Sequence, residues 1–210
     1  MTPTRRIDTP HGPAVAHLQL AGDPRAALVL GHGAGGGVAA RDLAAAARAA
    51  ADAGFGVVLV EQPYRVAGRR SPPRAPQLDA AWTAVVEALA GDELRGLPLV
   101  TGGRSAGARV ACRTAASTRA AGVLCLAFPL RPPRRSGGAP PPSREDELDA
   151  VEVPVLVVQG ERDPFGMPTG GPSREVVTVP GTHSLRSAGR VADAVAEAIR
   201  DWLGELPLAG

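Results

Sequence analysis

Lysine is absent from this chain of 210 residues, so its basic side chains, apart from four histidines, are all arginines. The 23 arginines are nearly balanced by 21 acidic residues, and the formal net charge is only +2. The arginines are spread along the whole sequence and form no basic stripe. The charge pattern therefore does not predict a nucleic-acid partner.

Cysteine and long apolar runs are also scarce. The two cysteines, Cys112 and Cys125, lie among apolar residues and predict ordinary core thiols rather than a disulfide framework. No run approaches the roughly 20 apolar residues that a membrane-spanning helix needs. A secretion signal would require an apolar segment after the paired Arg5 and Arg6, and the sequence has none there. We therefore expect a cytoplasmic protein without a membrane partner.

The hydrophobic content of 44% is enough for a sizeable core, and no linker divides the chain, so we expect one domain over residues 1–210. Short apolar runs alternate with helical patterns, which predicts an α/β protein with a doubly wound, mostly parallel sheet and helices on both faces. The expected strands are 14–20, 26–30, 56–60, 97–101, 121–127, 154–159 and 174–179. The other expected elements are helices over about 39–53, 78–89, 143–150 and 191–203, a helix after residue 105, and proline-rich loops over 61–76 and 128–142.

Residues 99–109 combine an apolar strand, a serine between glycines and the start of an alanine-rich helix. The centre of this stretch, Gly103–Gly107, reads GRSAG and matches the pattern G-x-S-x-G. A serine on so sharp a turn is strained and exposed, and the glycines let neighbouring chains pass without Cβ clashes. The following helix directs its free N–H groups at the same place. The Ala106 amide is therefore predicted to stabilise an oxyanion beside Ser105.

A second glycine-rich segment, Gly31–Gly37, lies between an early strand and the next helix. Such a loop either cradles a nucleotide phosphate or donates a backbone N–H to an oxyanion. The segment lacks the G-x-G-x-x-G spacing and the P-loop lysine, and Glu61 is the only candidate for a ribose-binding acid. The pattern favours the oxyanion hypothesis, with Ala34 as the donor. His32 is more typical of a residue that orders the loop than of a catalytic base.

An acid and a histidine follow two later strands. Asp163 comes just after the strand 154–159, and His183 comes just after the strand 174–179. Because the carboxyl ends of parallel strands share one edge of a sheet, Ser105, Asp163 and His183 are predicted to converge. A serine needs a base to become nucleophilic, and the base needs an acid to fix its tautomer. We predict Ser105 as the nucleophile, His183 as the base and Asp163 as the acid.

Each of these three residues also has an ordinary structural explanation. Ser105 could cap a helix, Asp163 could form a turn before Pro164, and His183 could lie on the surface. The chain order of serine, acid and histidine, together with the early glycine loop, favours the catalytic interpretation.

Other residues are weaker candidates for the same roles. Asp146 or Asp149 could supply the acid from the loop of the preceding strand. His11 and His17 lie in or before the first strand and are poor candidates for the base.

Two arginines, Arg104 and Arg109, lie inside the serine turn and one helical turn beyond it. A guanidinium beside a nucleophile either binds a carboxylate or phosphate of the substrate or connects nearby loops. We predict the connecting role for Arg109, whereas both roles stay open for Arg104. His32, Gly33 and Arg104 are candidate substrate contacts. The arginines of the 61–76 loop are expected to be mostly solvated.

These residues resemble the α/β-hydrolase superfamily and, within it, small cap-less members similar to dienelactone hydrolases. A closer similarity is to a predicted bacterial hydrolase family that shares its domain with a subunit of a eukaryotic chromatin-modifying complex, the nonspecific lethal complex. The resemblance implies Ser105 as nucleophile, Asp163 as acid and His183 as base, with no metal or organic cofactor. It extends over nearly the whole chain, through residues 32–36, 102–109, 128–130, 157–166 and 181–184.

Dienelactone hydrolases carry a cysteine nucleophile, so a serine at this position favours ordinary ester or thioester chemistry. We therefore predict a serine hydrolase of small acyl esters or thioesters, monomeric or homodimeric, with an oxyanion hole formed by the Ala34 and Ala106 amides. A catalytically idle scaffold that binds a protein or a small ligand is the alternative, and a cofactor-free haloperoxidase-like activity is a third. The acyl and alcohol groups depend on pocket shape, which the sequence does not specify.

Overall fold

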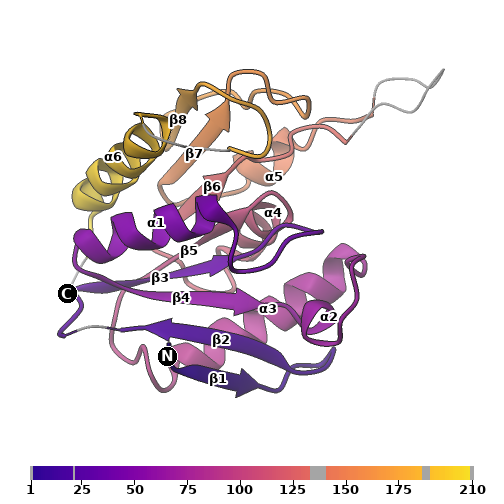
Figure 1. Cartoon of the computed structure of the whole chain (residues 1–210), viewed down its shortest axis with the longest axis vertical. Helices are drawn as coiled ribbons and strands as arrows, with labels where there is room; N and C mark the ends of the chain where they lie inside the picture. The colour runs from indigo at the N-terminus through magenta and orange to yellow at the C-terminus, as the bar shows by residue number, and fades with distance from the viewer. Residues whose placement is uncertain (1, 21, 133–140, 186–189, 209–210) are drawn as a thin grey trace.

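A single twisted sheet runs through the molecule in the computed structural model, which describes residues 2–20, 22–132, 141–185 and 190–208. Within these residues, eight strands pair in the order β1-β2-β4-β3-β5-β6-β7-β8 (Figure 1). Strands β3 to β8 pair in parallel, whereas β1 and β2 are added antiparallel at one edge. The strands are β1 (Thr4–Ile7), β2 (Ala14–Gln19), β3 (Ala26–Gly31), β4 (Phe55–Glu61), β5 (Leu99–Arg104), β6 (Gly122–Leu126), β7 (Val155–Gly160) and β8 (Arg174–Val179).

Helices cover both faces of the sheet, as the alternation of patterns predicts. The helices are α1 (Arg41–Asp52), α2 (Pro63–Val66), α3 (Ala75–Ala90), α4 (Ala106–Thr114), α5 (Glu145–Asp149) and α6 (Arg190–Glu205). Helices α1 and α6 pack side by side on one face, and α3 and α4 pack together on the other (Figure 1). No helix in the described ranges is both long enough and apolar enough to span a bilayer.

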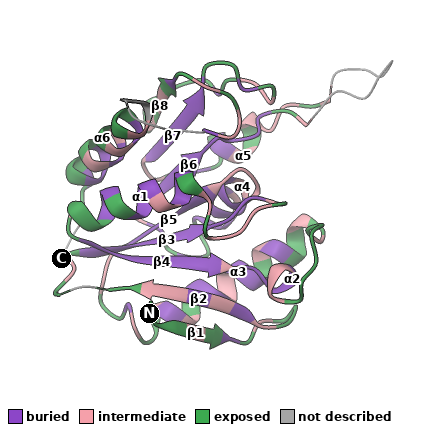
Figure 2. Cartoon of the chain, in the orientation of Figure 1, coloured by how far each residue is buried: buried purple, intermediate pink, exposed green. Residues whose placement is uncertain are grey.

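The central strands are mostly apolar because both of their faces are buried. In β3, Leu28 and Leu30 pack toward α1 and α6, whereas Ala27 and Val29 pack toward α3. Successive side chains of a strand point to opposite faces, so such a strand favours apolar residues on both faces. The buried centre and the more exposed β1–β2 edge are visible in Figure 2.

Two elements differ from the sequence-based expectation. Strand β1 differs from the expectation because three of its four residues are polar and it lies at the exposed edge, where apolar patterning is not required. Helix α2 lies inside the 61–76 segment that we expected to be a loop. Its four residues are too few for helical periodicity, although Pro63 is suited to the first turn of a helix.

Other expectations are met with shifted limits, and one is partly outside the described residues. Helix α3 begins at Ala75, three residues before the expected position, and β5 continues to Arg104. Cys112 and Cys125 are free and buried, as predicted. The expected proline-rich connection over 128–142 includes residues 133–140, which lie outside the described ranges.

The register of the parallel strands brings several strand ends to one edge of the sheet. Gly31 at the end of β3 is paired with Gly103 near the end of β5. Gly160 at the end of β7 is paired with Val179 at the end of β8. The loops that follow these strands therefore meet at the same edge, which is where ligands bind in open α/β sheets.

Candidate active site

Ser105 lies on a strained turn between β5 and α4, with a φ of 51° and a ψ of −105°. A positive φ is unfavourable for a residue with a Cβ atom and is a feature of functional turns. The turn also packs unusually close to β3. A Cβ on Gly103 would lie 2.4 Å from the Gly31 carbonyl oxygen, and one on Gly107 would lie 2.5 Å from it. The prediction that these two glycines are needed for close approach is confirmed.

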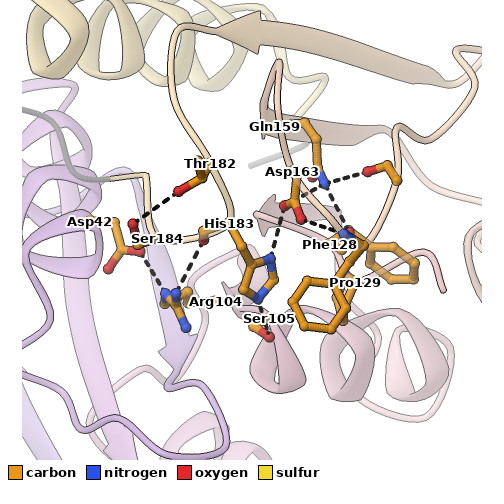
Figure 3. A network of polar contacts seen from close by, with 12 residues as sticks. Asp42, Arg104, Ser105, Phe128, Pro129, Gln159, Asp163, Thr182, His183 and Ser184 are labelled. Atoms are coloured by element: carbon orange, nitrogen blue, oxygen red, sulfur yellow. Dashed lines mark hydrogen bonds and ion pairs between the residues drawn. The ribbon is translucent and has the colours of Figure 1, made fainter. Parts of the chain in front are cut away.

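The structure brings Ser105, His183 and Asp163 together in one hydrogen-bonded series. The Oγ of Ser105 lies 2.9 Å from Nε2 of His183, and Nδ1 of the same ring lies 2.9 Å from Oδ2 of Asp163 (Figure 3). The Asp163 side chain is fully buried, whereas that of His183 is 17% exposed. A carboxylate at Nδ1 holds the proton there, so that Nε2 faces the serine hydroxyl as an acceptor.

The Asp163 carboxylate has two further donors. Its Oδ1 accepts the Phe165 backbone N–H at 2.8 Å. Its Oδ2 also accepts Nε2 of Gln159 at 2.9 Å. The Phe165 ring then packs against the His183 ring, with 4.3 Å between the centroids. The turn after β7 therefore orients both the acid and the imidazole.

Gln159 is a site residue that the sequence did not single out. It is fully buried in β7, and its Nε2 also donates to the carbonyl oxygens of Phe128 at 3.1 Å and Gly166 at 2.9 Å (Figure 3). One amide thus joins the ends of β6 and β7 to the acid. The only sequence signal is a polar residue inside an otherwise apolar strand.

Arg104 connects α1 to the backbone of the histidine. Its Nε donates to Oδ2 of Asp42 at 2.8 Å, and its Nη2 donates to the His183 carbonyl oxygen at 3.2 Å (Figure 3). Asp42 is buried, and its Oδ1 accepts the Leu43 N–H at 2.9 Å. Of the two roles that the sequence left open for Arg104, these bonds perform the connecting one. Asp42 was not singled out, because an acid in the first helical turn is ordinary.

His32 orders the glycine loop, as its position suggested. Its Nδ1 lies 2.9 Å from the Gly33 carbonyl oxygen, and the Gln62 N–H donates to its Nε2 at 3.1 Å. Both ring nitrogens therefore have backbone partners, and a substrate contact of His32 stays a prediction. Burial lowers the pKa of His32, which favours the neutral ring that these bonds require.

The glycine loop lies beside the serine turn because Gly31 is paired with Gly103. The Tyr64 hydroxyl of α2 donates to the Ala34 carbonyl oxygen at 2.8 Å and fixes the peptide group between Ala34 and Gly35. In the described ranges the Ala34 N–H donates no backbone hydrogen bond. Ala106 is the first residue of α4, where an N–H has no partner within the helix. Both amides therefore remain candidates for the oxyanion role.

The weaker candidates for acid and base are engaged elsewhere. Asp149 lies 3.0 Å from Nη2 of Arg174, and Asp146 is exposed on α5. His17 of β2 lies 4.0 Å from the Glu61 carboxylate, on the antiparallel side of the sheet. The acid that contacts the serine-bound histidine is Asp163 alone among the described residues.

Arg109 has the connecting role that we predicted for it. From α4 it donates two hydrogen bonds to the Glu147 carboxylate on α5, with Nε 2.8 Å from Oε2. Arg113, one turn later, binds both Glu147 and Asp79 of α3. These ion pairs fix α4, and with it the serine turn, against its neighbours.

A cavity of about 570 Å³ is lined in part by Arg104 and Ser184, which are the chain neighbours of Ser105 and His183. Its described lining residues are Gly33, Gly36, Ala40, Arg41, Asp42, Arg104 and Ser184. No group of three or more His, Cys, Asp or Glu side chains is arranged to hold a metal ion in the part of the chain that the structure describes.

The sequence matches a family model described as an alpha/beta hydrolase domain over residues 24–184. No curated protein matches the sequence significantly. A serine hydrolase without lid from Xanthomonas campestris is similar, with 22% identity, a TM-score of 0.72, and coverage of 100% of this chain and 97% of that chain. Est1E from Butyrivibrio proteoclasticus has 17% identity, a TM-score of 0.75, and coverage of 97% and 98%. A dienelactone hydrolase from Anabaena variabilis has 16% identity, a TM-score of 0.74, and coverage of 97% and 96%.

Proposed function

The chain belongs to the α/β-hydrolase domain family and has the fold of its cap-less members, and on this premise we propose that it is a serine hydrolase of small acyl esters or thioesters. The observation that most supports the proposal is the series of two 2.9 Å contacts from Ser105 through His183 to Asp163. A serine that is hydrogen-bonded to a carboxylate-oriented imidazole has the arrangement that activates it as a nucleophile. The proposal treats residues 1–210 as one catalytic domain.

The reaction begins when Ser105 Oγ attacks the carbonyl carbon of the substrate. Nε2 of His183 accepts the hydroxyl proton, and the negative charge moves to the carbonyl oxygen, where the Ala34 and Ala106 amides stabilise it. The protonated His183 then gives its proton to the leaving alcohol or thiol. Water, deprotonated by the same imidazole, attacks the acyl-serine, and His183 passes this proton to Ser105 Oγ as the acid is released.

Asp163 stabilises the imidazolium during both steps. Its carboxylate is fully buried and faces Nδ1 of His183 at 2.9 Å, so the interaction acts in a medium of low dielectric constant. Gln159 and the Phe165 N–H keep this carboxylate in place. Phe165 also limits the freedom of the His183 ring by packing against it.

Labelling with a fluorophosphonate probe tests the proposal directly, because the probe reacts with activated serines. We expect a stable adduct on Ser105 of the wild type, none on Ser105→Ala, and labelling at least about 100-fold slower in His183→Ala. Ser117→Ala and His11→Ala change exposed residues of the same types and should label like the wild type. Absence of labelling in folded wild-type protein would reject the proposal and favour the idle scaffold.

A substrate screen then separates ester from thioester chemistry. Hydrolysis of 4-nitrophenyl acetate and of an acetyl thioester should both depend on Ser105, and the ratio of their kcat/KM values identifies the preferred leaving group. Labelling of Ser105 without turnover of either substrate would contradict the proposed acyl-group size.

A further inference from the structure

The cavity lined by Arg104 and Ser184 adjoins the proposed active site along the chain. Three of its lining residues, Gly33, Arg104 and Ser184, each adjoin in sequence a residue of that site. The start of α1 contributes Ala40, Arg41 and Asp42 to the lining. The volume of about 570 Å³ falls in the usual range for small-molecule sites. The cavity is therefore one residue along the chain from both Ser105 and His183.

The one acidic residue among the described lining residues is already neutralised. Asp42 accepts Arg104 Nε at one carboxylate oxygen and the Leu43 N–H at the other. Its carboxylate is also almost fully buried, with 4% of the side chain exposed. Neither oxygen is left to attract a cation or to repel an anion at close range.

The guanidinium of Arg104 keeps one nitrogen for another partner. Its Nε and Nη2 bind Asp42 and the His183 carbonyl, while Nη1 makes no hydrogen bond to the described residues. Nη1 lies 2.7 Å from the position that a Cβ on Gly33 would occupy. This nitrogen therefore lies over the bare Cα of Gly33, which belongs to the wall of the cavity.

A second guanidinium lines the same cavity from the start of α1. Arg41, the first residue of α1, is exposed and lines the cavity together with Arg104. With Asp42 neutralised by Arg104, the side chain of Arg41 gives the described lining a net positive charge. A planar guanidinium is well suited to carboxylate and phosphate oxygens.

We propose that this cavity binds an anionic group of the substrate, a carboxylate or a phosphate, through Arg41 and Nη1 of Arg104. The inference rests on the proposed hydrolase function and narrows its substrate class to esters or thioesters that carry an anionic group. Arg104 then has two roles, since the bonds that hold the His183 backbone also fix Nη1 at the cavity. Gly33 gives the room that the Arg104 guanidinium needs.

Matched substrates test the inference through turnover. On the leaving-group side, the anionic 4-acetoxybenzoate and 4-acetoxyphenyl phosphate are compared with the neutral 4-acetoxybenzamide. On the acyl side, the 4-nitrophenyl monoester of adipic acid is compared with 4-nitrophenyl hexanoate. The measured quantity is the ratio of kcat/KM for each anionic substrate to that for its neutral partner, which cancels effects common to both.

The variant Arg41→Ala is compared with Arg48→Ala, which removes the same charge from an exposed residue of the same helix outside the cavity lining. We expect Arg41→Ala to lower the ratio about tenfold for at least one anionic substrate, mainly through KM, as the loss of one charge-assisted contact predicts. Arg48→Ala should leave every ratio unchanged. The substrate whose ratio falls most shows whether the cavity prefers a carboxylate or a phosphate. It also shows whether the anionic group belongs to the acyl side or to the leaving-group side.

Ratios that stay within twofold of the Arg48→Ala values for all substrates would overturn the inference while leaving the proposed hydrolase intact. A measurement without turnover separates the two proposals further. Calorimetric titration of Ser105→Ala with phenyl phosphate and with benzoate should show binding that is about tenfold weaker when Arg41→Ala is added. If neither ligand binds Ser105→Ala, the anion site is rejected, whatever the labelling of Ser105 shows.

Discussion

Gln159 donates its side-chain amide to Oδ2 of Asp163 at 2.9 Å, the same oxygen that faces Nδ1 of His183. Both residues belong to β7 and the turn that follows it, and both are buried. Asp163 is thus oriented by a residue of the strand that precedes it, independently of its contact with His183. This arrangement fixes the plane of the carboxylate and, through it, the imidazole.

Replacing Gln159 by Met keeps a side chain of similar size and removes the amide donor. We expect kcat for ester hydrolysis to fall about tenfold with little change in KM, because the acid loses its orientation. The free energy of unfolding should fall by about 1–3 kcal/mol, since the buried Asp163 carboxylate and the Gly166 carbonyl each lose a donor. Gln77→Met, at an exposed position of α3, is the control. Unchanged kcat in folded Gln159→Met protein would contradict the prediction.

The parallel part of the fold was predictable because it depends on local composition. A strand buried on both faces is mostly or wholly apolar, as in Ala26–Gly31, and this pattern is visible without tertiary information. The convergence of Ser105, Asp163 and His183 was also predictable, since parallel strands bring their carboxyl ends to one edge.

The remaining features depend on partners that lie far away in the sequence. Strand β1 is defined by its pairing with β2. It lies at an exposed edge, so its sequence has little apolar pattern. Gln159 looks like a polar residue in an apolar strand, and Asp42 looks like an ordinary acid of a first helical turn. Nothing local specifies that they bind Asp163 and Arg104. Side-chain partnerships of this kind are set by the packing of whole elements.

The close approach of α4 to β3 makes Gly107 sensitive to any added atom. A Cβ there would lie 2.5 Å from the carbonyl oxygen and 2.7 Å from the carbonyl carbon of Gly31, both backbone atoms. Gly107→Ala should therefore lose about 3 kcal/mol or more of unfolding free energy, or fail to fold. In Gly204→Ala, on α6, the new Cβ meets nothing within 4 Å, so this control should be neutral or gain up to about 1 kcal/mol. Urea unfolding measures both, and equal midpoints would refute the steric argument.

The Tyr64 hydroxyl anchors the proposed oxyanion loop through the Ala34 carbonyl. Burial raises the pKa of Tyr64 to about 12, so the hydroxyl stays a donor throughout the range in which the enzyme is assayed. Tyr64→Phe should lower kcat about five- to tenfold and the unfolding free energy by about 1 kcal/mol. The loss of kcat should be the same from pH 6 to pH 9. Turnover equal to that of the wild type would mean that the loop keeps its conformation without this bond.

The neutral state of His32 predicts a loss of stability in acid. Burial lowers its pKa below the model-peptide value of 6.5, which the unfolded chain retains. The unfolded state therefore binds more protons below about pH 6.5, and the free energy of unfolding should decrease there as the pH falls toward the folded-state pKa. The stabilisation is complete above pH 6.5, and one proton limits the slope to about 1.4 kcal/mol per pH unit. Protonation of Nε2 also removes the bond from the Gln62 N–H.

Urea unfolding from pH 5 to pH 8 tests this behaviour. His32→Gln should be less stable than the wild type at pH 8, because one amide cannot replace both ring nitrogens, but its stability should depend less on pH. His11→Gln removes an exposed histidine and should keep the wild-type slope. The other histidines are common to the wild type and His32→Gln, so their contributions cancel in the difference. Parallel pH profiles for these two proteins would show that His32 titrates alike in the folded and unfolded states.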